Sequence, residues 1–131
     1  MALLKKYLSK IYIPVIWTSL ILVLLSLPGS MLPDEHAIKI PHLDKAVHIS
    51  LFGIFVFLWC FYFNCKKMPL KKLLLIFFYI FILAVIIGTG MEFVQKYFIP
   101  NRSFDEGDII ADMIGAGFVY GICNTVLLRF E

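Results

Sequence analysis

Residues 73–91 read LLLIFFYIFILAVIIGTGM, an unbroken apolar run that contains no charged side chain. As a helix rising 1.5 Å per residue, a run of this length reaches about 28 Å, which matches the hydrocarbon core of a bilayer. A run this long is typical of a membrane-spanning helix rather than of the core of a soluble domain. It therefore predicts one transmembrane helix, and the rest of the chain is interpreted around it.

The composition of the whole chain extends this prediction. Hydrophobic residues make up 61% of the 131 residues and charged residues only 16%. A soluble domain of this size cannot bury so much apolar surface, whereas a bilayer solvates it. Three further apolar runs of about 17 to 20 residues occupy 11–27, 46–63 and 109–128. We therefore predict an all-α, integral membrane bundle of four transmembrane helices that forms a single domain over residues 1–131.

The positions of the lysines predict which way the helices run. Lys5, Lys6 and Lys10 precede the first run, Lys66, Lys67, Lys71 and Lys72 separate the second from the third, and Arg129 follows the fourth. The other two connections mix both signs of charge and include Asp34, Glu35, Lys39 and Arg102. Since basic loops stay on the cytoplasmic side, we expect both termini in the cytoplasm and the two mixed connections outside. The first run is long for a signal peptide and no small-residue cleavage site follows it, so we expect a retained anchor.

This topology gathers the chemically distinctive polar residues into one layer at the outer ends of the helices. They are Asp44, Lys45, His48, Glu92, Gln95, Arg102, Asp105, Asp108 and Asp112. Asp44 and His48 share one helix face at i,i+4, and so do Asp108 and Asp112. The loop charges and the positions of these residues are separate observations, and their agreement predicts a shared polar pocket.

Asp112 gives the strongest argument for the pocket. A carboxylate one turn inside an apolar helix costs roughly 3 kcal/mol or more unless it is paired or solvated. The available partners are Arg102, Lys45 and His48. The other polar residues also have ordinary structural roles open to them: an interfacial histidine, a headgroup anchor at Lys45, and a helix-capping acid at Asp108.

Small residues and cysteines point to packing rather than chemistry. The spacings of Ala111 with Gly115 and of Gly117 with Gly121 let helices approach closely, and Gly88 precedes Glu92 on the third run. The three cysteines are odd in number and lack metal-type spacing, so they predict reduced thiols rather than disulfides or a zinc site. Glycine-rich phosphate loops, haem patterns and basic–aromatic stripes are absent from the sequence, which argues against soluble cofactors and nucleic acid.

Four short motifs resemble the VanZ-like family of small bacterial membrane proteins. They are DKAVH at 44–48, EFVQ at 92–95, PNRSFD at 100–105 with Asp108, and DMIG at 112–115. One residue departs from the family pattern: Asp112 stands where the family usually has asparagine, and a protonated carboxyl group would mimic the amide donor. The resemblance implies an envelope role in the bacterial cytoplasmic membrane and an association with resistance to the glycopeptide teicoplanin.

The first functional hypothesis is binding of a lipid headgroup or a lipid-linked envelope precursor. Arg102 and Lys45 would hold a phosphate or carboxylate, the arginine as a fork and the lysine as a point charge. The remaining candidate ligand-binding residues would orient these cations or bind hydroxyl and amide groups: Asp44, Gln95, Asp105, Asp108 and Asp112.

Two further hypotheses remain open. One is a membrane enzyme that modifies or hydrolyses an envelope lipid, with His48 and Glu92 as the acid–base pair and a divalent metal held by the histidine and the nearby acids. No serine or cysteine stands in a recognised nucleophile motif, which disfavours covalent catalysis. The other is a small transporter or channel subunit, which the lack of charged residues at mid-membrane disfavours.

Overall fold

Three long helices dominate the structure. The computed structural model describes residues 2–32 and 40–127, and this part of the chain is helical, without strands. The helices α3 (Leu43–Asn64), α4 (Leu70–Phe98) and α5 (Glu106–Val126) are long and apolar enough to cross a membrane. The apolar helix α2 (Tyr12–Leu25) is shorter, with 14 residues, and it lies between α1 (Ala2–Leu8) and the 3₁₀ turn η1 (Gly29–Met31). The all-α prediction is confirmed for the described residues, and three of the four predicted spans are helices long and apolar enough to cross a membrane. A fourth span and cytoplasmic termini stay predictions.

The three long helices begin or end beyond the apolar runs that predicted them, whereas α2 (Tyr12–Leu25) is slightly shorter than its run at 11–27. The largest difference is in α4, which continues about two turns past residue 91 to Phe98. It continues because no helix-breaking residue occurs before Pro100, and it ends where the residue before that proline, Ile99, is extended. The predicted end at 128 and the charges at Asp34, Glu35, Lys39 and Arg129 lie outside the described residues.

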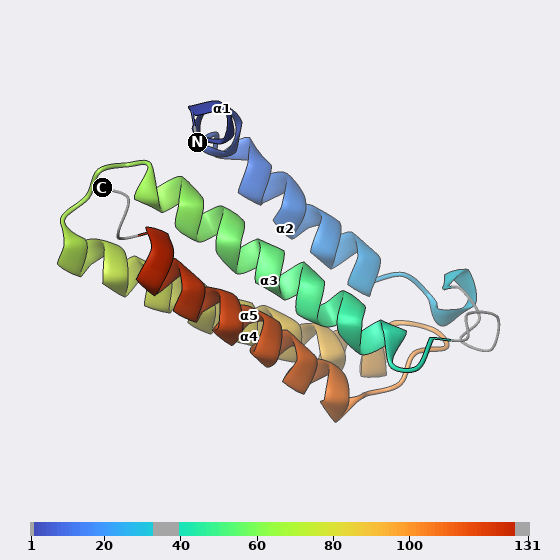
Figure 1. Ribbon diagram of the computed structural model, residues 1–131. Coiled ribbons are helices and arrows are strands. Elements are labelled where there is room, and N and C mark those ends of the chain that lie inside the picture. The colour runs from blue at the N-terminus through green and yellow to red at the C-terminus, as the bar shows by residue number, and fades with distance from the viewer. Residues whose placement is uncertain (1, 33–39, 128–131) are drawn as a thin grey trace.

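Successive helices run antiparallel, so the helix ends collect at two ends of the bundle (Figure 1). At one end, here called the polar end, the C-termini of α2 and α4 meet the N-termini of α3 and α5. At the other, the lysine end, the connection from α3 to α4 carries Lys66 and Lys67, and Lys66 lines a pocket together with Lys10 and Ile11. The polar candidate residues and the lysine-rich connection therefore lie at opposite ends, as the charge pattern requires. Which end faces the cytoplasm stays a prediction.

The core lies where α3, α4 and α5 pack against one another. Its largest fully buried side chains are aromatic: Phe52 and Phe55 on α3 and Phe77 on α4. Gly115 marks the closest approach of α5 to α3, because a Cβ atom there would collide with the carbonyl oxygen of Ile49. Gly121, by contrast, has nothing within 4 Å of such an atom. Only the first of the two predicted small-residue spacings therefore lies at a tight helix crossing.

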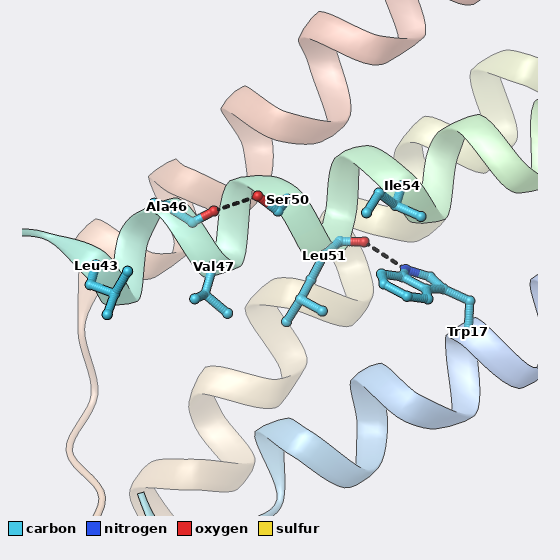
Figure 2. A pocket seen from close by; sticks show the side chains of 7 residues that line it. All are labelled: Trp17, Leu43, Ala46, Val47, Ser50, Leu51 and Ile54. Atoms are coloured by element: carbon cyan, nitrogen blue, oxygen red, sulfur yellow. Dashed lines mark hydrogen bonds between the residues drawn. The ribbon is translucent and has the colours of Figure 1, made fainter. Parts of the chain in front are cut away.

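The helix α2 is attached to the bundle by indole hydrogen bonds. Trp17 donates to the carbonyl oxygen of Leu51 at 3.0 Å, and Trp59 donates to the hydroxyl oxygen of Thr18 at 3.1 Å. Beside the first of these bonds an apolar groove of about 270 Å³ runs between α2 and α3 (Figure 2). Its lining consists of Trp17, Leu43, Ala46, Val47, Ser50, Leu51 and Ile54. The groove begins at the polar end, at the first turn of α3.

Candidate functional site

Lys45 joins the first turn of α3 to the start of α5. Its ammonium nitrogen lies 2.7 Å from Asp44 Oδ2, 2.7 Å from Asp105 Oδ2 and 2.8 Å from Asp108 Oδ1. The lysine side chain is 27% exposed, so this is a partly desolvated network rather than a set of fully exposed surface pairs. The positive charge of Lys45 is therefore already compensated by three carboxylates.

Asp105 fixes the place where α5 begins. It is the N-cap residue, and its Oδ1 accepts a hydrogen bond from the backbone nitrogen of Gly107 at 2.7 Å. Its own backbone nitrogen donates to Glu92 Oε2 at 3.0 Å, which links α5 to α4. The hydrogen bond from Lys45 holds the pKa of the Asp105 carboxyl below its ordinary value. Because α5 starts at Glu106, before the predicted start at 109, Asp108 is an acid of the first helical turn and Asp105 is the residue that caps the helix.

His48 and Asp112 form the buried centre of the site. Their Nδ1 and Oδ1 atoms lie 2.8 Å apart, and the residues are 5% and 1% exposed. His48 is thus the partner that Asp112 requires, in preference to Arg102 or Lys45. On its other side, Nε2 of the imidazole lies 3.6 Å from Asp108 Oδ2, which is too long for a hydrogen bond.

Gly88 makes room for the Asp112 carboxylate. A Cβ atom at position 88 would lie 2.5 Å from Asp112 Oδ2, so any larger residue on α4 would displace the acid. This oxygen is buried and has no hydrogen-bond partner among the described residues. A comparable role belongs to Gly107, where a Cβ atom would lie 2.6 Å from Lys45 Cε. The sequence analysis missed both contacts; the only signals were glycines inside helices, where their low helix propensity requires a reason.

Glu92 completes the site from α4. It is 1% exposed, and one of its oxygens lies within 4.8 Å of ligand atoms on His48 and Asp108. Together these contacts define the polar cluster, which contains Asp44, Lys45, His48, Glu92, Asp105, Asp108 and Asp112. Three helices and one loop contribute to it, and carboxylates outnumber the basic groups.

Gln95 and Arg102 stand apart from the hydrogen bonds of the polar cluster. Gln95 is 1% exposed and donates to the carbonyl oxygen of Leu25 at 2.9 Å, which fastens the end of α2 to α4. The side chain of Arg102 is half-buried, and within residues 5–32 and 40–127 it makes no ion pair or hydrogen bond. Arg102 thus remains a cation at the polar end whose partner is not one of the cluster acids.

Comparison with known proteins identifies the family. The sequence profile of the VanZ/LLP1 family matches residues 5–128, which is nearly the entire chain. Searches of curated proteins and of solved structures gave no match. The matched region includes all three membrane-spanning helices and every residue of the polar cluster. The protein is therefore a multi-pass membrane protein and belongs to the VanZ/LLP1 family.

Proposed function

We propose that this protein lies in the bacterial cytoplasmic membrane with its polar end outside, and that Arg102 and the polar cluster together bind the headgroup of a membrane lipid or lipid-linked envelope precursor. Membership of the VanZ/LLP1 family supports an envelope role. The excess of lysine at the opposite end supports the orientation, because basic segments stay in the cytoplasm.

The observation that carries the proposal is the burial of ionisable groups near the ends of the membrane-spanning helices. His48, Glu92 and Asp112 are at most 5% exposed, and each lies near the end of a membrane-spanning helix. Ionisable groups inside such helices are costly, and they face the bundle interior or a wet cavity where they serve a function. Their level at the helix ends is that of lipid headgroups.

The contacts indicate which groups would meet the ligand. Lys45 is enclosed by three carboxylates, so its charge is not free for a phosphate. Arg102, half-buried in the loop that leads to Asp105, is the fork-shaped donor that suits a phosphate or carboxylate. The apolar groove between α2 and α3 starts at Leu43, directly before Asp44, and we assign it to the hydrocarbon chain of the same ligand.

Lipid retention tests this function. The protein is purified in mild detergent and its bound lipids are counted by native mass spectrometry, for the wild type and for Arg102→Ala. We expect Arg102→Ala to lose the retained lipid. Lys96→Ala is the matched control, because Lys96 is an exposed cation near the same end whose ammonium group lies over the rings of Tyr97 and Phe104. Equal retention in the wild type and Arg102→Ala would contradict the proposal.

A cellular assay follows from the family association. Expression of the wild type in a susceptible bacterium is expected to raise tolerance of teicoplanin, and Arg102→Ala is expected to lower it toward the level of the empty vector. Lys96→Ala again serves as the control, with its membrane level checked by immunoblot. If Arg102→Ala and Lys96→Ala give the same tolerance, the resistance does not depend on headgroup binding at Arg102.

The His48–Asp112 pair favours one alternative function, a membrane enzyme acting on an envelope lipid. A carboxylate that holds one nitrogen of a histidine leaves the other nitrogen oriented for proton transfer, and Glu92 is close enough to serve as the second acid–base group. The test compares cells that express the wild type, His48→Ala or Glu92→Gln. If both variants preserve the teicoplanin phenotype, the enzymatic function is abandoned.

A further inference from the structure

The charges of the polar cluster do not balance. Five carboxylates, those of Asp44, Glu92, Asp105, Asp108 and Asp112, share one lysine and one histidine. Lys45 occupies the side of the cluster nearest the solvent, where it contacts three of the acids. On the buried side, Glu92 receives only a backbone hydrogen bond, and His48 is the basic group beside it in the described residues. Buried carboxylates this close together repel one another unless a cation stands between them.

The buried side has the geometry of a metal site. His48 on α3, Glu92 on α4 and Asp108 on α5 each offer one ligand atom, and these atoms all lie within 4.8 Å of one another. A metal ion with bonds of about 2.1 Å separates its ligand atoms by about 3.4 Å in a tetrahedral site. His48 Nε2 and Asp108 Oδ2 are 3.6 Å apart, which is close to this separation.

The orientation of His48 is an independent observation that points to the same ligand. Its Nδ1 is engaged by Asp112, while Nε2 has no hydrogen-bond partner in the described residues although the side chain is only 7% exposed. That nitrogen is directed at Asp108, whose second oxygen is already fixed by Lys45. Metal-binding histidines characteristically have their other nitrogen held by a carboxylate, which fixes the tautomer and the ring.

A second group of acids at the polar end does not form a candidate metal site. Asp44, Asp105 and Asp108 also place ligand atoms within 4.8 Å of one another. The ammonium group of Lys45 lies within 2.8 Å of all three, however, and so fills the position of an ion.

We propose that His48 Nε2, Glu92 and Asp108 bind one divalent transition-metal ion, zinc or manganese, and that Asp112 is the positioning residue for the histidine. One imidazole and two carboxylates suit these ions better than calcium or magnesium, which prefer all-oxygen sites. Three protein ligands leave a coordination position for water or for an oxygen of the bound headgroup. Because Nε2 donates its lone pair to the metal, this site excludes His48 as a general base. The metal site does not require the lipid ligand proposed above.

Metal binding by the full chain, reconstituted in zwitterionic lipid nanodiscs and stripped with chelator, tests this site. We expect the wild type to take up one Mn²⁺ or Zn²⁺ ion per chain, with nitrogen coupling from His48 in the pulsed EPR spectrum of the Mn²⁺ form. Glu92→Gln preserves the shape of the side chain but is expected to lower the affinity for the metal ion about a hundredfold. Asp112→Asn is expected to lower the metal affinity about tenfold, while the nitrogen coupling from His48 persists.

Asp44→Asn is the matched control, because it removes the same charge from the same cluster without removing a proposed ligand. It is expected to bind the metal as the wild type does. The proposed site is overturned if the wild type binds no ion or if its Mn²⁺ form shows no nitrogen coupling. It is also overturned if Asp44→Asn and Glu92→Gln lower the metal affinity equally. The wild-type measurements decide the matter even if Glu92→Gln fails to fold. Lipid retention by the stripped protein is measured separately, so failure of either proposal leaves the other standing.

Discussion

A 2.8 Å hydrogen bond joins His48 Nδ1 on α3 to Asp112 Oδ1 on α5, across 64 positions of the chain. Both side chains are buried, so the bond acts in a medium of low polarity, where an unsatisfied partner is costly. The bond therefore does two things. It ties together the two helices that approach most closely at Gly115, and it directs the second imidazole nitrogen toward Asp108.

Substitutions of Asp112 should separate its charge from its hydrogen bond. Asp112→Asn retains an oxygen that accepts from His48, so we expect a change in unfolding free energy within about 1 kcal/mol. Asp112→Ala leaves the buried imidazole without its partner and should destabilise the protein by about 3 kcal/mol. Unfolding in mixed micelles, followed by circular dichroism, measures both. Equal losses for the two variants would show that the hydrogen bond is not what stabilises this helix pair.

Asp105 predicts a dependence of stability on acid pH. Its pKa is lowered in the folded protein, so the stabilisation is present above the ordinary value and is lost as the pH falls through the folded value. Asp105→Asn removes the ion pair with Lys45, while an asparagine oxygen still caps α5. Between about pH 6 and about pH 3, the melting temperature of the wild type should therefore fall more than that of Asp105→Asn. Parallel curves for the two proteins would refute the role of this ion pair.

Much of this fold could be predicted because the bilayer imposes simple rules on length and charge. The apolar runs located α3, α4 and α5, and the lysines separated the two ends of the bundle. The helix boundaries were less predictable, since α4 continues through Glu92 and Gln95 to Phe98. Hydropathy detects where the bilayer ends, whereas a helix ends where its backbone is capped or broken.

The residues of the polar cluster could be predicted, but which of them contact one another could not. The spacing of Asp44 and His48 puts them on one helix face, and the order of the apolar runs puts Asp112 at the same end of the bundle. Both follow from the sequence. Whether Asp112 meets His48 or Arg102 depends on helix rotation and packing, which are set by contacts such as that of Gly115 with Ile49. The bond from Gln95 to Leu25 was equally inaccessible, because a carbonyl group at a helix end carries no sequence signal.

The hydrogen bond from Gln95 to Leu25 should contribute to the docking of α2 against α4. Replacing Gln95 with leucine removes the donor to the buried carbonyl of Leu25, so we expect a loss of about 1–2 kcal/mol that is confined to the docking of α2. Hydrogen exchange followed by mass spectrometry should show faster exchange at the C-terminal turns of α2 and unchanged exchange in α5. Unchanged protection of α2 would mean that its indole hydrogen bonds suffice to hold it.

Gly115 and Gly121 lie on the same helix and provide a matched test of the helix crossing. At position 115 a methyl group would collide with the backbone of Ile49, which cannot move aside as a flexible side chain does. Gly115→Ala should therefore push α5 away from α3 and destabilise the protein by about 2–3 kcal/mol.

At position 121 the same methyl group meets nothing within 4 Å, so Gly121→Ala should be neutral or stabilising by up to about 1 kcal/mol through its higher helix propensity. Unfolding of both variants under the same conditions measures the difference. His48 directly precedes Ile49, and Asp112 lies about one turn before Gly115, so the crossing should also set the His48–Asp112 bond. Gly115→Ala should then lower metal affinity and Gly121→Ala should not. Equal stability of the two alanine variants would contradict the packing of α3 against α5 described here.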